Sequence, residues 1–165
     1  MIIKASQHHL PQILILNSKI INFMQLMGFS HWNEKYPNEV IYRRDIMRNS
    51  QYVYLIDEKV KGIVSFDVQH HENFNSINWD SENKTSYFVH RLAVDPEFQG
   101  QGIANQLMDY AESFAKSKKI DSIRLGAFKK YSEVVRFYSK RGYTIRGEVL
   151  FDVSETPFLG MEKKL

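Results

Sequence analysis

The sequence predicts an α+β domain of three layers, in which helices flank a mixed, mostly antiparallel central sheet. Strand-like segments rich in β-branched and aromatic residues alternate along the chain with segments of helical periodicity. The 165 residues show no internal repeat, low-complexity tract or interdomain linker, and this length suits one domain with a sizeable core. We therefore expect residues 1–165 to form a single domain with about seven strands and about four helices.

The first half of the chain carries signals for three strands and two helices. They are expected over residues 2–5, 7–27, 39–48, 52–56 and 60–68. Ser6 and Asn38 are residue types that cap helix N-termini, Pro11 suits a first turn, and Gly28 suits the end of the first helix. The polar stretch over residues 69–83 is long for a hairpin loop, so we expect it to have a role of its own.

The second half carries signals for four further strands and two helices. The strands are expected over residues 85–94, 123–128, 143–152 and 158–162, one helix is expected to begin near Gly102, and the other is expected over residues 132–140. The helix that begins near Gly102 has an apolar stripe at helical period, formed by Ile103, Leu107, Tyr110, Ala111, Phe114 and Ala115. Gly142 suits the end of the second helix, and Pro157 is expected to separate the last two strands.

A glycine-containing loop between a strand and a helix is the most informative feature of the chain. It consists of Gln99, Gly100, Gln101, Gly102, Ile103 and Ala104. The first N–H groups of a helix have no partner within the helix, and the helix dipole places positive charge there. Because glycines let another molecule approach the backbone closely, this loop is expected to bind an anion such as a diphosphate.

The residues of the loop exclude two common diphosphate-binding motifs. The chain has no Gly-Lys followed by Ser or Thr, as a Walker loop requires. Asn105 stands where a dinucleotide-binding fingerprint has its third glycine, and Asp121 and the strand after it come in the wrong order. The remaining pattern, Gln-x-x-Gly-x-Ala after a strand that ends in Leu-Ala-Val-Asp-Pro, resembles the GNAT superfamily of acetyl-CoA-dependent N-acetyltransferases. Residues 136–143 resemble that family's second signature, a late helical tyrosine before a Gly-aromatic turn.

The resemblance implies that acetyl-CoA is the cosubstrate and that strands four and five splay apart to admit its pantetheine arm. Backbone groups of Leu92, Ala93 and Val94 would then bind this arm and polarise the thioester carbonyl. The side chains of these three residues fit an ordinary buried strand equally well. Tyr131 stands where the family commonly has an asparagine that contacts the cofactor, so Tyr131 is expected at the cofactor site too.

Two residues are candidates for proton transfer. Tyr138 matches the family's general acid, and a phenol with a pKa of about 10 stays protonated at neutral pH and can donate to a departing thiolate. His90 titrates near neutrality and is expected to share one strand face with Leu92 and Val94, which makes it the preferred base. Either side chain can instead have only a packing role. Weaker candidates for the base are Glu34, Asp67 and Glu82, and a relay of water molecules needs none of them.

The loop over residues 29–37 is the expected acceptor site, because by resemblance this region overhangs the cleft opposite the cofactor. Trp32 and Tyr36 offer aromatic faces that attract an ammonium group, and Glu34 offers a negative charge. The alternative is that Trp32 and Tyr36 only anchor the loop to the core. In that case residues 69–83 are the next candidate region.

Composition limits the partners. The formal net charge of +3 suits an anionic cofactor but is too weak a basic bias for a nucleic-acid-binding protein. The chain has no cysteine, which excludes disulfides, thiolate metal sites and an acetyl-cysteine intermediate. His70 and His71 are adjacent and lack a further ligand at suitable spacing, so no metal is expected. A basic group after the fifth strand either faces solvent or contacts the nucleotide phosphates, and comprises Lys129, Lys130, Arg136, Lys140 and Arg141.

The most apolar segment, residues 13–27, is interrupted by polar residues and lacks the length of a membrane span. Without a basic, apolar leader at the start of the chain, the cytoplasm is the expected compartment. We therefore expect an N-acetyltransferase that moves an acetyl group from acetyl-CoA to a primary amine, on a small molecule, peptide or protein, by direct attack in a ternary complex. Homodimers are common in the family, so a homodimer is one expected assembly. The alternative is a non-catalytic acyl-CoA-binding sensor or partner module of the same fold.

Overall fold

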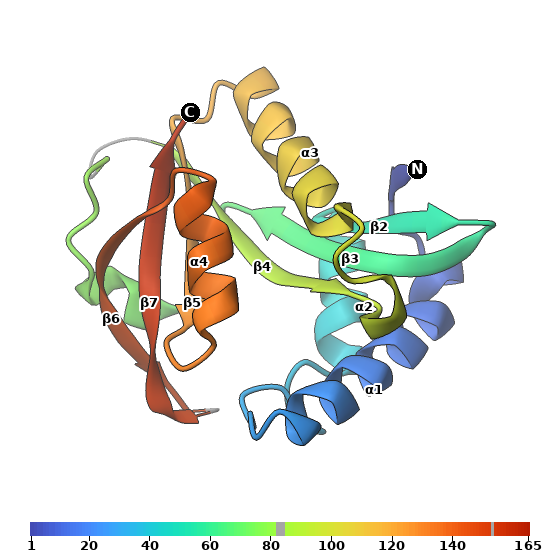
Figure 1. Cartoon of the computed structure of the whole chain (residues 1–165). Coiled ribbons are helices and arrows are strands. Elements are labelled where there is room, and N and C mark those ends of the chain that lie inside the picture. The colour runs from blue at the N-terminus through green and yellow to red at the C-terminus, as the bar shows by residue number, and fades with distance from the viewer. Residues whose placement is uncertain (82–84, 153) are drawn as a thin grey trace. The chain divides into compact units, whose positions relative to one another are not determined.

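The computed structural model describes residues 1–81, 85–152 and 154–165 (Figure 1). The chain divides into two compact units. The first unit consists of Met1–Phe66 and Arg91–Ala111, and the second of Asp67–His90 and Glu112–Leu165. Strand β3 (Lys59–Asp67) through its last residue, strand β4 (Ser86–Val94) and helix α3 (Ile103–Ser117) each contribute residues to both units. Glu82, one of the weaker candidates for the base, lies outside the described residues.

The strands form a mixed sheet, as expected for an α+β fold. Their order is β1-β2-β3-β4-β5-β7-β6. β4 and β5 run parallel, with a register from Ser86↔Ser122 to Val89↔Leu125, and the other pairings whose register is described are antiparallel. The described residues contain seven strands and four α-helices, so the expected fold class and the approximate numbers of elements are confirmed. None of the helices described here is long and apolar enough to cross a membrane.

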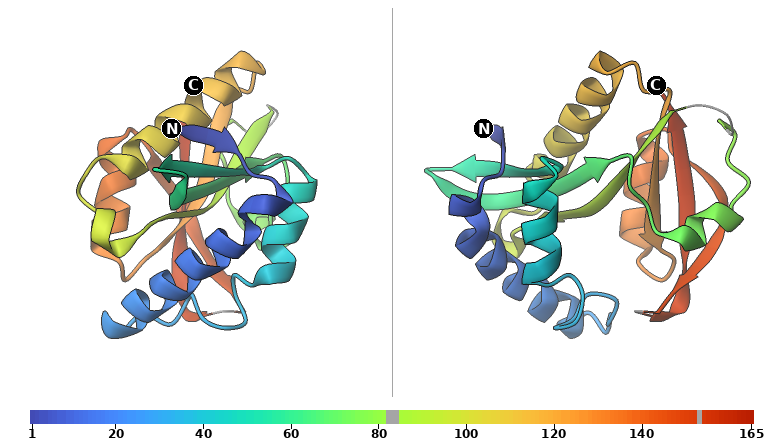
Figure 2. Two further views of the ribbon diagram at one scale, coloured as in Figure 1. Left: turned by 90° about the vertical axis from the view of Figure 1, so that its right-hand side faces the viewer. Right: turned by 180° about the vertical axis from the view of Figure 1, so that it is seen from behind.

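In the first unit, helices α1 (Leu10–Leu26) and α2 (Glu39–Met47) lie on the same side of strands β2 (Gln51–Ile56) and β3 (Lys59–Asp67), as both views in Figure 2 show. β1 (Ile2–Lys4) pairs with β2. The core between these helices and strands is made of buried side chains that include Leu10, Ile13, Leu16, Ile20, Trp32, Tyr42, Ile46, Val53 and Ile63. Each helix thus buries a stripe of apolar side chains against the strands, and this burial holds both helices on the sheet.

Gly62 on β3 lets the first turns of α3 pack close to the strand. A β-carbon at Gly62 would lie 3.0 Å from a methyl group of Ile103 and 3.0 Å from a methyl group of Leu107. Contacts of a β-carbon are rarely that short, so the bare backbone at Gly62 sets how closely β3 and the start of α3 approach.

The expected helix caps in the first unit are confirmed with one difference. Ser6 is the N-cap of a short 3₁₀ turn, Gln7–His9, and α1 itself begins only at Leu10. Asn38 caps α2 as expected, because its side chain accepts a hydrogen bond from the backbone N–H of Ile41 at 3.2 Å. The predicted cap is therefore confirmed for α2, whereas at α1 it begins the 3₁₀ turn that precedes the helix.

The second unit contains β5 (Ser122–Phe128), α4 (Ser132–Lys140), β6 (Thr144–Phe151) and β7 (Ser154–Lys164), together with the first residues of β4. Its core includes a cluster formed by Phe74, Ile77, Trp79, Phe88 and Val149. The first three of these belong to the polar stretch that was expected to have a role of its own. In the described residues 69–81, that role includes packing, since these apolar side chains bury themselves against the sheet.

The expectation that Pro157 separates the last two strands is wrong. β7 begins at Ser154 and continues through Pro157, while the pairing of β6 with β7 changes register between Val149 and Phe151. Proline lacks the N–H that a regular ladder needs, and a register shift is a place where that N–H is not required. The strand therefore accommodates a residue that normally marks its boundary.

Candidate functional site

The glycine loop lies in the first unit, between the end of β4 and the start of α3. Gly100 and Gly102 have φ angles of +75° and +80°, which residues with a side chain rarely adopt. A β-carbon at either position would have no heavy atom within 4 Å, so both α-carbons face open space. The loop can therefore receive another molecule against its backbone.

The backbone amides of the loop are oriented as donors at the start of a helix. The N–H of Gln106 donates a helical hydrogen bond to the carbonyl of Gly102, at 3.0 Å. In the part of the chain that the structure describes, no hydrogen bond is donated by a backbone N–H of residues 100–104. Amides at the positive end of a helix are the groups that bind phosphate oxygens. The geometry thus agrees with the anion site expected from the sequence.

Asp95, directly after β4, fixes the strand end from which the loop departs. Its buried carboxylate accepts hydrogen bonds from Lys19 and Lys61, each at 3.1 Å, and from the backbone N–H of Glu97 at 3.2 Å. Burial acts to raise the pKa of Asp95, but these hydrogen bonds outweigh burial and hold the pKa below its ordinary value. The sequence motif contains Asp95 but no role was predicted for it, although an Asp-Pro pair after a strand is a signal for a cap.

Leu92, Ala93 and Val94, expected to bind the cofactor arm, are the last residues of β4 in the first unit. Ala93 and Val94 are buried, and Leu92 is half-buried. The preceding residue, Arg91, has a φ of +52°. A left-handed residue interrupts the alternation of side chains along a strand. The prediction that His90, Leu92 and Val94 share one face assumed a regular alternation of side chains along the strand. That alternation is interrupted at Arg91.

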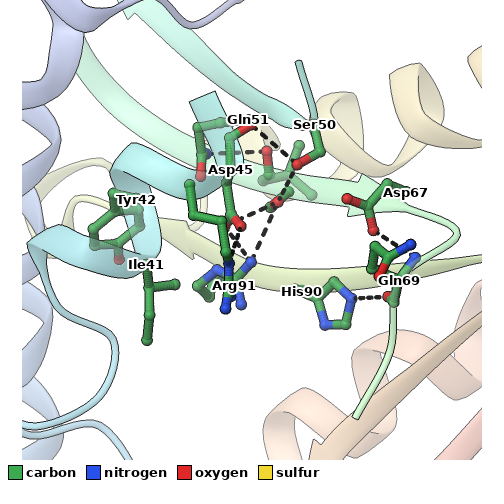
Figure 3. Close-up of polar contacts among 12 residues, drawn as sticks. Ile41, Tyr42, Asp45, Ser50, Gln51, Asp67, Gln69, His90 and Arg91 are labelled. Carbon is green, nitrogen blue, oxygen red and sulfur yellow. Dashed lines mark hydrogen bonds and ion pairs between the residues drawn. The ribbon is translucent and has the colours of Figure 1, made fainter. Parts of the chain in front are cut away.

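Arg91 is itself a buried cation (Figure 3). Its side chain is 6% exposed and pairs through Nη2 with Oδ2 of Asp45 on α2, whose side chain is 3% exposed. The guanidinium also donates to the hydroxyls of Tyr36 and Ser65, both at 3.4 Å. Sequence reasoning did not find this cluster, because Arg91 and Asp45 are 46 positions apart and neither stands in a motif that predicts the pairing.

The residues expected at the acceptor site also lie in the first unit, in three different environments. Trp32 is 8% exposed and belongs to the core cluster, which favours the anchoring role. Glu34 is exposed, and Tyr36 is half-buried with its hydroxyl at Arg91. Asn33 holds the turn between them, since Asn33 and Tyr36 exchange backbone hydrogen bonds of 2.7 and 3.1 Å. The loop is therefore an ordered turn that presents Glu34 to solvent.

Tyr138 lies in the second unit, on α4, and is 6% exposed. Its ring makes edge contacts with Phe137 and Tyr143, with ring centroids 5.1 and 5.6 Å apart. Burial raises the pKa of Tyr138 well above its ordinary value, and Arg141 opposes this shift only in part. The phenol therefore stays protonated throughout the physiological pH range, as a proton donor must.

Tyr131 is the N-cap residue of α4, but its side chain makes no capping hydrogen bond. It is 9% exposed, and burial raises the pKa of its phenol. A phenol offers a single polar atom where the family's asparagine offers a carboxamide with both a donor and an acceptor. Any contact of Tyr131 with the cofactor is therefore confined to one hydroxyl or to the face of the ring.

His90 lies in the second unit, and Figure 3 shows its ring beside Gln69. Nε2 of His90 is 2.8 Å from the backbone carbonyl of Gln69. Because a carbonyl oxygen only accepts, Nε2 of His90 is the donor in this hydrogen bond. Asp67, a weaker candidate for the base, accepts the backbone N–H of Gln69 at 2.8 Å and so holds this turn in place.

Two members of the basic group after β5 form ion pairs. Lys129 pairs with Glu148, and Arg141 pairs with Glu112 at 3.0 Å. The side chains of Lys130, Arg136 and Lys140 are exposed. Exposed basic side chains suit both a solvated face and contact with nucleotide phosphates.

The adjacent histidines have structural partners. The ring of His70 stacks on Phe88 with centroids 4.5 Å apart, and its Nε2 lies 3.0 Å from Oδ1 of Asn75. Nδ1 of His71 accepts the backbone N–H of Asn73 at 3.2 Å. Within the described ranges, no three side chains of the types that ligate metals come together.

Comparison with known proteins identifies the family. The model of the acetyltransferase (GNAT) family matches residues 16–143. The chain belongs to this family. The uncharacterized N-acetyltransferase YesJ of Bacillus subtilis is 26% identical to this GNAT chain over 102 residues, which are 62% of the chain. The match spans 57% of the length of YesJ.

Solved structures share the fold of this GNAT chain. A GNAT-family acetyltransferase from Streptococcus agalactiae has a TM-score of 0.86 at 22% identity, over 100% of this chain and 95% of its own. The PaiA N-acetyltransferase of Thermoplasma acidophilum, solved in complex with coenzyme A, has a TM-score of 0.76 at 21% identity, over 100% of this chain and 98% of its own. At these identities the likeness establishes the fold alone.

Proposed function

We propose that residues 1–165 form a single N-acetyltransferase domain that transfers an acetyl group from acetyl-CoA to a primary amine by direct attack in a ternary complex. Family membership and the name of the Bacillus relative support this reaction class. The observation that carries the proposal is the glycine loop, whose amides at the start of α3 donate no hydrogen bond within the described residues. Since the chain has no cysteine, the acetyl group passes to the amine without an acetyl-cysteine.

Acetyl-CoA would place its diphosphate against residues 99–104. Gly100 and Gly102 leave the backbone bare on its open side, and the dipole of α3 adds positive charge. The pantetheine arm would follow Leu92, Ala93 and Val94, whose backbone groups can pair with its two amides. Support for coenzyme A as the ligand comes from the complex of the Thermoplasma enzyme.

The transfer requires one bond to form and one to break. The uncharged amine nitrogen attacks the thioester carbonyl carbon, which forms the C–N bond and places negative charge on the carbonyl oxygen. The carbonyl then re-forms as the C–S bond breaks, and the electron pair of that bond leaves with sulfur. Backbone N–H groups of the segment from Leu92 to Val94 would stabilise the negative oxygen during this step.

Two protons must move during the reaction, and we assign one residue to each. Tyr138 donates a proton to the departing thiolate, and its raised pKa keeps the hydroxyl protonated until that moment. His90 is assigned the proton that the acceptor's ammonium group loses before its uncharged nitrogen attacks. The proton that this nitrogen loses after the attack replaces the one that Tyr138 gives to sulfur. A water relay is the alternative for the second assignment.

The acceptor amine would approach the loop over residues 29–37. Glu34 is exposed and offers a carboxylate to an ammonium group, and Tyr36 offers a partly exposed ring. Trp32 is assigned the anchoring of this loop because it lies in the core. The acceptor is a small molecule, a peptide or a protein, the cytoplasm is the proposed compartment, and a homodimer is a proposed assembly from the family resemblance.

Titration calorimetry with acetyl-CoA, followed by a CoA-release assay over a panel of amines, tests the proposal. Because the chain has no cysteine, a thiol-reactive dye reports released CoA without a background from the protein. We expect saturable binding of acetyl-CoA and thiol release that depends on the amine. Absence of binding would contradict the cofactor assignment. Binding without release for every amine would support the alternative, a non-catalytic acyl-CoA-binding module.

A further inference from the structure

The buried ion pair between Arg91 and Asp45 is the strongest feature that the proposed reaction does not use. It joins α2 to β4, one residue before the segment expected to bind the thioester. Ser65 on β3 completes the cluster, since its hydroxyl lies 3.3 Å from Oδ2 of Asp45 and 3.4 Å from Nη2 of Arg91. Figure 3 shows Asp45 and Arg91 directed toward one another.

Stability gives no sufficient reason for this arginine. A buried ion pair adds little to stability, because lost hydration offsets the attraction between the charges. Nε of Arg91 is also buried and lacks a hydrogen-bond partner in the described part of the chain. In addition, Arg91 has a φ of +52°, a conformation that costs free energy for any residue with a β-carbon. Unfavourable features at one position indicate a role other than stability.

We propose that Arg91 is a positioning residue that holds two parts of the active site in place at once. Through Asp45 it fixes the left-handed turn of β4, so the backbone N–H groups of Leu92, Ala93 and Val94 keep the direction that the thioester requires. Through its hydrogen bond to the hydroxyl of Tyr36 it ties the acceptor loop to the same strand. This inference rests on the proposed function of both segments.

A direct role as a ligand is less consistent with the contacts. The guanidinium of Arg91 already pairs with the carboxylate of Asp45, and the side chain of Arg91 is only 6% exposed. A carboxylate on the acceptor would have to displace Asp45, which would keep only Ser65 and the half-exposed Arg44, 3.7 Å away, as partners for its buried charge. Arg91 therefore acts through its neighbours.

The first test is a double variant, Arg91→Met with Asp45→Asn, which removes both charges and leaves none buried alone. The matched control is Arg124→Met with Glu162→Gln, because Arg124 and Glu162 form another buried pair at 3.0 Å, with side chains 10% and 1% exposed. We expect kcat to fall about a hundredfold in the first variant, the effect of a small misplacement of reacting groups. The control keeps its kcat at a temperature where both variants are folded.

The second test is Tyr36→Phe, which removes one hydroxyl and leaves the ion pair intact. We expect the KM of the amine to rise by about two- to tenfold, as for the loss of one hydrogen bond, with the affinity for acetyl-CoA unchanged. Tyr54→Phe is the matched control, because its hydroxyl donates to Gln106 at 3.2 Å in the same unit. An unchanged amine KM in Tyr36→Phe would contradict the tie to the acceptor loop.

Amide hydrogen exchange tests the positioning without turnover. We expect exchange at residues 92–94 and 33–36 to accelerate at least about tenfold in the Arg91 and Asp45 variant relative to the Arg124 and Glu162 control. Unchanged exchange at residues 92–94 would overturn the inference even if the protein has no transferase activity. If the wild type is active, retention of kcat in the double variant overturns the inference and leaves the proposed function intact. A rise in KM confined to amines that carry a carboxylate would overturn it in favour of a ligand role.

Discussion

Replacing Gly102 by alanine separates binding from folding at the glycine loop. Gly102 has a φ of +80°, and a β-carbon there would meet no heavy atom within 4 Å. In the unliganded protein the variant therefore suffers only the strain of a left-handed residue, about 1–2 kcal/mol. For a chain of 165 residues this lowers the melting temperature by about 2–8 °C. If a diphosphate rests on this backbone, the methyl group occupies its place, and the affinity for acetyl-CoA falls at least about a hundredfold, or about 3 kcal/mol.

Gly28 provides a matched control for this experiment. It follows α1 with a φ of +78°, and a β-carbon there would also meet no heavy atom within 4 Å. The melting temperature of Gly28→Ala, measured by circular dichroism, should therefore fall by a similar amount. Its affinity for acetyl-CoA, measured by titration calorimetry, should equal that of the wild type. Equal affinities of the two variants for acetyl-CoA would refute the placement of the diphosphate at Gly102.

Three further predictions concern single side chains. Tyr138→Phe keeps the ring packing and should lower kcat by about 10² to 10⁴ with little change in acetyl-CoA affinity, and undiminished turnover would leave Tyr138 a packing role only. Trp32→Ala should destabilise the protein by about 3–5 kcal/mol in denaturant unfolding with a nearly unchanged amine KM, whereas a raised KM at wild-type stability would return Trp32 to the acceptor site. Burial lowers the pKa of His31 from 6.5 to about 4, so between these values the unfolded chain binds a proton that the folded chain does not. Unfolding free energy should therefore fall by about 3 kcal/mol as the pH drops from about 6.5 to about 4, and an equal fall in His31→Gln would show that another group is responsible.

Much of the fold could be predicted because its signals act over a few residues. Asn38 caps α2 through a hydrogen bond to an amide three positions later, and Gly142 follows α4 with a φ of +87°. The glycine loop is equally local, since it is one segment between a strand and a helix. Such features need no knowledge of the rest of the chain.

Other features depend on residues that meet only in the folded chain. Asp45 and Arg91 are separated by 46 positions, and no spacing rule connects them. Trp79 belongs to a stretch that is polar in sequence, and its burial requires Phe74 and Phe88 as partners. The place of Pro157 within a strand follows from the register of the neighbouring strand, which the sequence around the proline does not encode.

The close packing at Gly62 has a consequence for how variants of this protein should be interpreted. Ile103 belongs to the glycine loop, and a methyl group at Gly62 would clash with its side chain. A substitution there would push the start of α3 away from β3, and the amides of the loop would move with the helix. Gly62 is not expected to touch any ligand. The residues that contact a ligand and the residues on which its binding depends are therefore two different sets, and mutational scans of this protein will report the second.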